Sequence, residues 1–495
     1  MKGKLKILMV FSEVAPFAKT GRVGEVGGAL PKALKEMGHD VRVITPQYRV
    51  TNERKYVLRD VIRLQNIEVP LGKETIRINV KSAFLPNSKV QVYFIDYKPF
   101  FFRDGLYSDP KNSKDYSDND KRFILFSKGV LETLTKLQWQ PNVIHCHDWQ
   151  SGLIPFLLKM VYKDDPFFYK IFSLFTIHNF AFQGNFDPKC TSDIGLDGNF
   201  VFPGSGLDFH GKCSFLKAGI VYADVINSVS EQYALEVQSS SDSKYGMEEV
   251  LKTREASLYN VVNGIDYSVW DPDVDNFIPE KYNIHNLVGK EGNKRALLER
   301  HGLPFSRKTP IIAMISNLTT QDGLHLVRNA FDDLMRMNVY FILLGAGDKS
   351  YHRFFEQMSK KYEDRVGISL AYDDSLAHLI EAGADIFLIP SMHGHGGLTP
   401  LYSLKYGTVP VVCATEGVTN TVQPFDPDTG KGMGFVFHDS DVEHMLKAIK
   451  LAVQTFEDRK IWLRIMKNGM RVDFSWSVSS KKYVQLYSKC ISKKK

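Results

Sequence analysis

The chain has 495 residues, more than the ~250–300 at which one hydrophobic core stops growing, so at least two domains are expected. Hydrophobic residues make up 43% and charged residues 24%, which excludes a disordered chain. The 63 Lys and Arg residues exceed the 56 Asp and Glu residues by only 7. Such a small excess argues against a nucleic-acid-binding surface.

The five cysteines are scattered and form no CxxC pair, a pattern typical of reduced thiols in a cytoplasmic protein. No apolar run reaches the ~18 residues of a membrane span. Residues 1–11 resemble a short signal peptide, but Lys6 interrupts the apolar run and no cleavage site follows. We therefore expect a cytoplasmic chain that does not enter a membrane, with residues 5–11 forming a buried strand.

Strands and helices alternate along the first half of the chain. The apolar run 5–11 has the length of a strand, a glycine-rich segment follows it, and residues 29–37 have the pattern of a helix. A further helix is predicted at residues 121–136. Further strands are predicted at residues 41–45, 90–95, 143–147 and 172–178. This alternation predicts an α/β unit with a parallel sheet.

The same alternation restarts after a polar segment, residues 271–310, which contains several prolines and glycines and a short predicted helix at 293–300. Further strands are predicted at residues 310–315, 339–344, 366–371, 385–389 and 409–413. We therefore predict an N-terminal Rossmann-like domain over residues 1–265 and a C-terminal one over residues 266–475. Ligands of such domains bind at the carboxyl ends of the strands, so a cleft between the two domains is the expected site.

A glycine-rich segment, KTGRVGEVGG at residues 19–28, follows the first strand and precedes a helix. Backbone N–H groups and the positive end of a helix bind phosphate in such a place, and Lys19 adds a cation. The spacing is not the dinucleotide-binding pattern. A tight turn that only packs the helix on the strand explains the glycines equally well.

Two histidines and a carboxylate, His145, His147 and Asp148, end a predicted strand as IHCHDW. Alternation along the strand places His145 and His147 on one face. A metal pair is conceivable, with His393 and His395 as further ligands, but no carboxylate or cysteine stands at a fitting spacing. We expect no metal, and a sugar or phosphate site suits these polar groups better.

Polar groups also follow two other strands. His178 and Asn179 end the strand at 172–178, at the edge where a parallel sheet places its ligands. The segment SMHGHGGLT at 391–399 joins a strand to a helix, and this predicts a second anion site. Its donors are the N–H groups and hydroxyl of Gly397, Leu398 and Thr399. A flexible surface loop is the alternative.

Ten short motifs occur in the order of one known family. They are KTG at 19–21, HDW at 147–149, TIHNFAFQG at 176–184, FLKAG at 215–219, YADVINSVS at 222–230, NGID at 263–266, GAGD at 345–348, GGLTPLY at 396–402, YGTVP at 406–410 and DFSW at 473–476. With these motifs the chain resembles the bacterial glycogen synthases and plant starch synthases, which are retaining glycosyltransferases. The resemblance spans nearly the whole chain.

The resemblance implies a GT-B fold, in which two Rossmann-like domains face each other across a cleft and residues 476–495 form a helix that returns to the first domain. It implies that glucose passes from ADP-glucose to the non-reducing end of an α-1,4-glucan, without a cofactor.

The resemblance also implies roles for single residues. His178 matches the histidine that contacts the transferred glucose, Lys19 matches a lysine near the donor phosphate or the acceptor, and Asp148 matches a polar group in the cleft. The residues implied in substrate binding are Gly21, Glu25, Asn179, Gly397, Leu398 and Thr399.

Five positions depart from the family pattern. Arg22 replaces a glycine and Glu25 replaces an aspartate in the first glycine-rich segment. Asn317 and Asp322 stand where the family has an arginine and a lysine, and Gly394 stands where it has a glutamate. Because charge develops on the leaving diphosphate, the loss of two cations there weakens transition-state stabilisation.

These departures leave three hypotheses open. The first is a synthase with a rearranged phosphate site, in which Arg22 and His393 or His395 restore part of the charge. The second is a catalytically impaired paralogue that binds glucan or regulates an active synthase. The third is transfer from a different donor.

Overall fold

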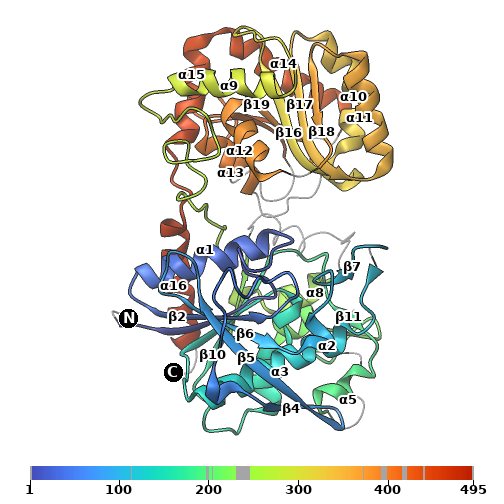
Figure 1. The fold of residues 1–495 in the computed structure, drawn as a ribbon, viewed down its shortest axis with the longest axis vertical. Helices are drawn as coiled ribbons and strands as arrows, with labels where there is room; N and C mark the ends of the chain where they lie inside the picture. The colour runs from blue at the N-terminus through green and yellow to red at the C-terminus, as the bar shows by residue number, and fades with distance from the viewer. Residues whose placement is uncertain are drawn as a thin grey trace. The chain divides into compact units, whose positions relative to one another are not determined.

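The computed structural model describes residues 3–112, 114–196, 200–202, 204–229, 246–371, 373–391, 398–414, 421–438 and 441–492. The chain divides into two compact units, one of residues 1–264 with 476–495 and one of residues 265–475. Each unit is built on a sheet with helices on both of its faces (Figure 1). The two units are described separately below.

The first unit contains a mostly parallel sheet in the order β15-β14-β10-β9-β1-β2-β6-β5-β3, with β4 paired to β5. Its strands are β1 (Lys6–Val10), β2 (Asp40–Pro46), β3 (Arg59–Asp60), β4 (Ile67–Leu71), β5 (Glu74–Phe84), β6 (Gln91–Asp96), β9 (Val143–His147), β10 (Phe172–Ile177), β14 (Val225–Ser228) and β15 (Leu258–Asn260). The segment that resembles a signal peptide forms β1, which pairs with β2 on one side and β9 on the other. The antiparallel strands β3, β4 and β5 were not predicted.

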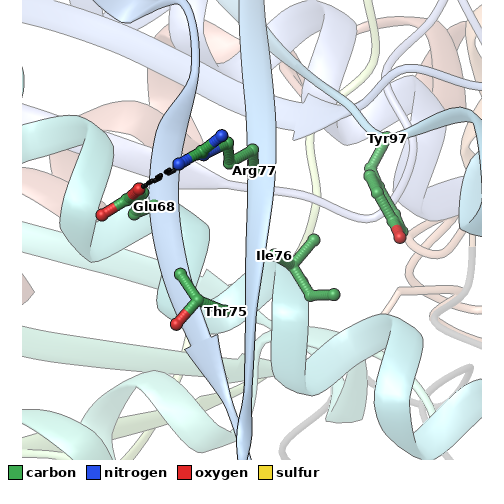
Figure 2. Close-up of a pocket in the computed structure, with 5 residues that line it drawn as sticks. All are labelled: Glu68, Thr75, Ile76, Arg77 and Tyr97. Carbon is green, nitrogen blue, oxygen red and sulfur yellow. Dashed lines mark hydrogen bonds and ion pairs between the residues drawn. The ribbon is translucent and has the colours of Figure 1, made fainter.

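A hollow of about 420 Å³ lies on the hairpin of β4 and β5. Figure 2 shows Arg77 paired with Glu68 on one side of it and Tyr97 on the other. The Arg77 Nη2 to Glu68 Oε1 distance is 2.9 Å. None of the predicted site residues lines this hollow.

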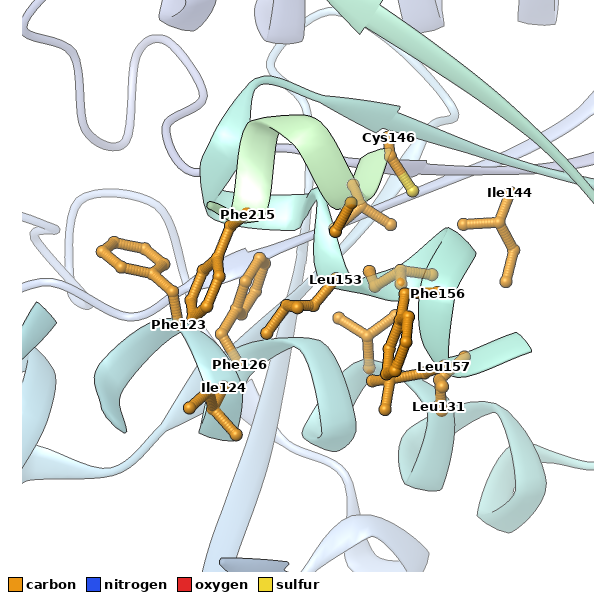
Figure 3. Close-up of a cluster of buried hydrophobic side chains, with 14 of the residues drawn as sticks. Phe123, Ile124, Phe126, Leu131, Ile144, Cys146, Leu153, Phe156, Leu157 and Phe215 are labelled. Atoms are coloured by element: carbon orange, nitrogen blue, oxygen red, sulfur yellow. The ribbon is translucent and has the colours of Figure 1, made fainter. Parts of the chain in front are cut away.

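Helices cover both faces of the first sheet, so its central strands are buried on both sides. The helices are α1 (Arg22–Glu36), α2 (Lys98–Phe101), α3 (Asn119–Leu137), α4 (Leu153–Phe156), α5 (Cys190–Ile194), α6 (Phe215–Tyr222), α8 (Glu248–Thr253) and α16 (Trp476–Ser492). Two small sheets lie apart from the main one. One pairs β7 (Ser108–Asp109) with β8 (Lys114–Asp115), and the other has three strands in the order β11 (Asn185–Phe186), β13 (Lys212–Ser214) and β12 (Asp208–Phe209). Figure 3 shows the core on one face, where α3, α4 and α6 pack on β9. Burying one such Phe or Leu side chain contributes about 1.5–3 kcal/mol.

The prediction of a loop before the first helix was wrong, because α1 begins at Arg22 and includes most of the glycine-rich segment. A Cβ atom on Gly27 would lie 3.0 Å from the Glu13 carbonyl oxygen. A Cβ atom on Gly28 would lie 2.8 Å from the Ala15 carbonyl oxygen. These two glycines therefore let α1 pack closely against the loop that follows β1.

The C-terminal helix α16 packs on the first unit, against α1 and β10. Tyr483 and Tyr487 are fully buried there. The Ser479 hydroxyl donates a 2.8 Å hydrogen bond to the Val262 carbonyl. The tyrosine hydroxyls reach polar groups of the sheet, which links this helix to the strands that end at the candidate site.

The second unit contains a parallel sheet in the order β18-β17-β16-β19-β20-β21. Its strands are β16 (Ile311–Leu318), β17 (Tyr340–Gly347), β18 (Val366–Ser369), β19 (Ile386–Ile389), β20 (Val409–Cys413) and β21 (Phe435–Phe437). Its helices are α9 (Val288–Arg300), α10 (Leu324–Arg336), α11 (Lys349–Lys361), α12 (Asp374–Gly383), α13 (Leu398–Lys405), α14 (Val442–Glu457) and α15 (Arg459–Met470).

The polar segment 271–310 lies wholly within the second unit. Asp275 is buried and accepts hydrogen bonds from His378 Nδ1 at 2.8 Å and from the Tyr406 hydroxyl at 2.6 Å. The Trp270 ring stacks on His378 with centroids 3.6 Å apart. The start of this segment is therefore packed on α12 and on the end of α13, although its composition resembles that of a linker.

Candidate active site

The strand order places a topological switch point between β1 and β9 in the first unit. From β1 the chain continues to β2 and β6 on one side, whereas β9 is followed by β10 and β14 on the other. The loops after β1 and β9 therefore diverge, and ligands of open α/β sheets bind where such loops part. Glu13 follows β1, Asp148 follows β9 and His178 follows β10.

Asp148 has a backbone conformation that is rare for a residue with a side chain, with φ at 54°. Strain of this kind concentrates at functional sites. Its carboxylate accepts a 2.7 Å hydrogen bond from the His178 N–H and a further one from the Asn179 N–H. Burial raises the pKa of Asp148 to about 7, against the lowering effect of these two bonds. Asp148 therefore changes its charge close to neutral pH.

Glu13 is a buried carboxylate that fixes the loop before α1. It accepts hydrogen bonds from the N–H and hydroxyl of Thr20, from the Gly21 N–H at 3.2 Å and from the Tyr107 hydroxyl at 3.2 Å. The prediction that this segment offers its N–H groups to a phosphate is therefore wrong for Thr20 and Gly21. Sequence reasoning missed Glu13 and Tyr107, although the place of Glu13 directly after β1 was a usable signal.

Lys19 forms an ion pair with Glu25, with 2.7 Å between Nζ and Oε1. Both side chains are partly exposed. Glu25 lies in the first turn of α1 and Arg22 is the first residue of that helix. The structure thus brings Lys19, Gly21, Arg22 and Glu25 together, and Glu25 partly balances the charge of Lys19.

His178 and His147 share a hydrogen bond, with 3.0 Å between His147 Nδ1 and His178 Nε2. Burial lowers the pKa of His178 to about 3 and holds the pKa of His147 well below its usual 6.5. Both rings are therefore neutral at pH 7. Asn179 lies beside them, and its side-chain oxygen accepts a 2.8 Å hydrogen bond from the Ala181 N–H, which shapes the following loop.

His145 and His147 lie on one face of β9, as predicted, with ring centroids 4.0 Å apart. Both ring nitrogens of His145 already have hydroxyl partners, the Tyr487 hydroxyl at 2.9 Å and Thr176 Oγ1 at 2.7 Å. Within the described ranges, no three His, Cys, Asp or Glu side chains are grouped as metal ligands. His393 and His395 lie outside the described residues.

The second sheet has its own switch point, between β16 and β19. Asn317 is exposed near the end of β16, and Asp322 Oδ2 accepts a 2.7 Å hydrogen bond from Thr319 Oγ1. Leu398 begins α13 and Thr399 lies in its first turn. Gly394 and Gly397 of the predicted phosphate loop lie outside the described residues.

Two family models and two solved structures identify the class of protein to which the chain belongs. The starch synthase catalytic domain family matches residues 6–253, and glycosyl transferases group 1 matches residues 298–469. The catalytic domain of starch synthase IV from Arabidopsis thaliana matches with a TM-score of 0.90 and 29% identity, over 99% of this chain and 100% of that one. Sucrose-phosphate synthase from Thermosynechococcus elongatus shares the fold alone, with a TM-score of 0.60 and 15% identity, over 98% of this chain and 99% of that one. These matches confirm the predicted α/β fold of a GT-B glycosyltransferase.

Sequence identity to named relatives identifies the family within this class. The chain is 40% identical to a glycogen synthase of Koribacter versatilis, over 98% of each chain. It is 38% identical to a glycogen synthase of Thermotoga petrophila, over 99% of each chain. The chain therefore belongs to the glycogen and starch synthase family of hexosyltransferases, as its motifs predicted. These comparisons give no support to the hypothesis of an impaired paralogue.

Two further predictions concern membrane-spanning segments and the cysteines. Across the described ranges, no helix is long and apolar enough to cross a membrane. All five cysteines lie in the described part of the chain, where they are buried and none forms a disulfide. The prediction that they are core residues is confirmed.

Proposed function

We propose that this protein transfers glucose from ADP-glucose to the non-reducing end of an α-1,4-glucan, with retention of configuration. The observation that carries the proposal is the pairing of Asp148 and His178 at the switch point of the first sheet, through a 2.7 Å hydrogen bond from the His178 N–H to the Asp148 carboxylate. The pair places an ionisable carboxylate and a neutral imidazole at the edge where this fold binds ligands.

The chemistry needs charge stabilisation more than proton transfer by the protein. As the bond from glucose C1 to the phosphate oxygen breaks, positive charge develops on the sugar and negative charge on the departing ADP. The acceptor hydroxyl then bonds to C1, and its proton passes to the leaving phosphate. The ionised Asp148 carboxylate stabilises the sugar cation, and the neutral His178 ring binds a sugar oxygen.

Each unit contains groups that suit the anionic part of the donor. We assign the diphosphate to the first turn of α13, with Leu398 and Thr399, since N–H groups at the start of a helix favour anions. Lys19 supplies a cation whose charge Glu25 moderates at 2.7 Å. Arg22 adds a second positive charge to the first unit, at the start of α1.

Two comparisons support the choice of substrates. The matching catalytic domain of starch synthase IV is bound to ADP and acarbose. Similar curated relatives are named glycogen synthases. We further propose a cytoplasmic enzyme that needs no cofactor besides its donor and no nucleic-acid partner; the five buried thiols fit a reducing compartment.

Separate calorimetric titrations of the full chain with ADP-glucose and with a maltooligosaccharide test the proposal. Both ligands are expected to bind, and UDP-glucose is expected to bind more weakly than ADP-glucose. Binding of the maltooligosaccharide without either nucleotide sugar would instead favour a glucan-binding paralogue that regulates an active synthase.

A further inference from the structure

Two buried ring nitrogens next to the candidate site have no hydrogen-bond partner among the described residues. They are Nε2 of His147 and Nδ1 of His178. The other nitrogens of these rings, His147 Nδ1 and His178 Nε2, lie 3.0 Å apart. Buried polar atoms nearly always have a partner, so an unpaired one at a ligand edge calls for an explanation.

The hydrogen bond between the two rings leaves only two arrangements of protons. Each ring is neutral and therefore carries one N–H, because burial disfavours the charged form of both histidines. Either His147 donates Nδ1–H to His178 Nε2, or His178 donates Nε2–H to His147 Nδ1. The first arrangement leaves an unpaired N–H on His178, and the second leaves an unpaired N–H on His147.

The two histidines differ in burial, and this difference favours the first arrangement. The His147 residue is 0% exposed, whereas His178 is 8% exposed and stands at the carboxyl edge of the sheet. A buried N–H without an acceptor is costlier and rarer than a buried acceptor without a donor. The first arrangement places the unpaired N–H on His178, the less buried of the two residues, and leaves only a lone pair on the deeper ring.

The His147 ring packs between two other rings. Phe11 stacks on it with centroids 3.9 Å apart and an interplanar angle of 16°. The His145 ring also packs against it, with ring centroids 4.0 Å apart. Hydrogen bonds to the hydroxyls of Tyr487 and Thr176 hold His145 in turn. A continuous series of contacts therefore runs from α16 through two histidines to the ring of His178.

We propose that His147 is a positioning residue, which donates its Nδ1–H to Nε2 of His178 and so fixes His178 as the Nδ1–H tautomer, ready to donate to a sugar oxygen. The sugar as ligand rests on the proposed function, but the tautomer does not. His147 itself touches no substrate. The predicted effect is therefore on the His178 ring, which contacts the substrate, whereas the substitution is made at His147.

Two substitutions of His147 separate its hydrogen bond from its bulk. His147→Phe keeps a flat ring beside Phe11 but removes the donor. His147→Asn loses the ring but places an amide N–H close to where Nδ1 was. We expect kcat to fall ~10–10²-fold in His147→Phe, which is less than the loss expected when a donor is removed outright. The KM for ADP-glucose should change little. In His147→Asn, kcat should recover in part.

The tautomer is measured directly by nitrogen NMR of chains labelled in histidine, with the His178 signals identified by their absence from His178→Gln. The native chain is expected to show the Nδ1–H form of His178, and His147→Phe is expected to shift it toward Nε2–H. Tyr487→Phe is the matched control, since it removes a buried hydrogen bond from the same series of contacts without touching His178. It should lower stability yet leave the His178 tautomer unchanged.

An Nε2–H tautomer of His178 in the native chain would overturn the proposal, and so would an unchanged tautomer in His147→Phe. Losses of kcat that match losses of stability in both His147→Phe and Tyr487→Phe would show a structural role only. If the native chain fails to use ADP-glucose, the proposed substrate is wrong, and the tautomer measurement still decides the role of His147.

Discussion

Replacing Asp148 with asparagine is expected to lower kcat by ~10²–10³-fold, the usual loss when one electrostatic group of a transition state is removed. The amide oxygen of asparagine can still accept the hydrogen bond from the His178 N–H, which is 2.7 Å long in the native chain. The loss would therefore come from the missing negative charge rather than from a displaced loop. Initial rates with saturating ADP-glucose measure it, and an unchanged kcat would remove Asp148 from the mechanism.

The pH dependence of the same variant gives a second, independent result. Because the pKa of Asp148 is raised to about 7, the carboxylate is ionised above that pH and neutral below it. The native kcat should therefore rise as pH increases through about 7, if the ionised form stabilises the sugar cation. Asp148→Asn has no such ionisation, so this rise should be absent from its residual activity.

The raised pKa of Asp148 also predicts how the stability of Asp148→Asn compares with that of the native chain at different pH values. The folded pKa of about 7 exceeds the unfolded value of about 3.9, so between them the folded state binds more protons. Native stability therefore decreases as pH rises through this window, whereas the asparagine variant escapes that decrease. Urea unfolding of both chains at about pH 5 and about pH 8 should show the variant gaining stability relative to the native chain.

Restoring the family's charges in the second unit is expected to raise kcat/KM for ADP-glucose. Asn317→Arg and Asp322→Lys return two cations and remove a carboxylate, and Gly394→Glu completes the family pattern. A hydrogen bond to a charged group contributes about 1.5–3 kcal/mol, which corresponds to ~10–10²-fold. The combined variant should gain more than any single one, since the groups would act on one ligand. Incorporation of labelled glucose at limiting ADP-glucose measures the gain.

A control is needed because Asp322 also holds its own loop, through the 2.7 Å bond from Thr319 Oγ1. Thr319→Val removes that bond without changing any charge, so it reports the cost of loosening the loop alone. If the native chain is active and the combined variant loses activity beyond this control, the chain has evolved its own phosphate site. Arg22, at the start of α1, would then be the first residue to test.

The sequence located the candidate site because parallel sheets place ligands at the carboxyl ends of strands. His178 and Asp148 were found by this rule, and the structure joins them through the His178 N–H. The alternation of strands and helices predicted two α/β units, and the family motifs added the returning helix α16. Strand β9 was predicted with its observed bounds, residues 143–147.

Contacts between distant residues were beyond sequence reasoning. The glycine-rich segment has the composition of a loop, yet residues 22–28 are helical because their glycines fit against the carbonyls of Glu13 and Ala15. The capture of the Thr20 and Gly21 N–H groups by Glu13 depends on the path of the chain after β1. No metal was expected at the two histidines of IHCHDW, but their partners, two hydroxyls for His145 and the His178 ring for His147, could not be foreseen.

Transfer of labelled glucose from ADP-glucose to glycogen by the purified native chain tests the central claim most directly. Incorporation is expected to depend on both substrates, to be lost when the product is treated with β-amylase, and to fall by ~10²–10³-fold in Asp148→Asn. No incorporation by a folded chain that still binds glucan would contradict it.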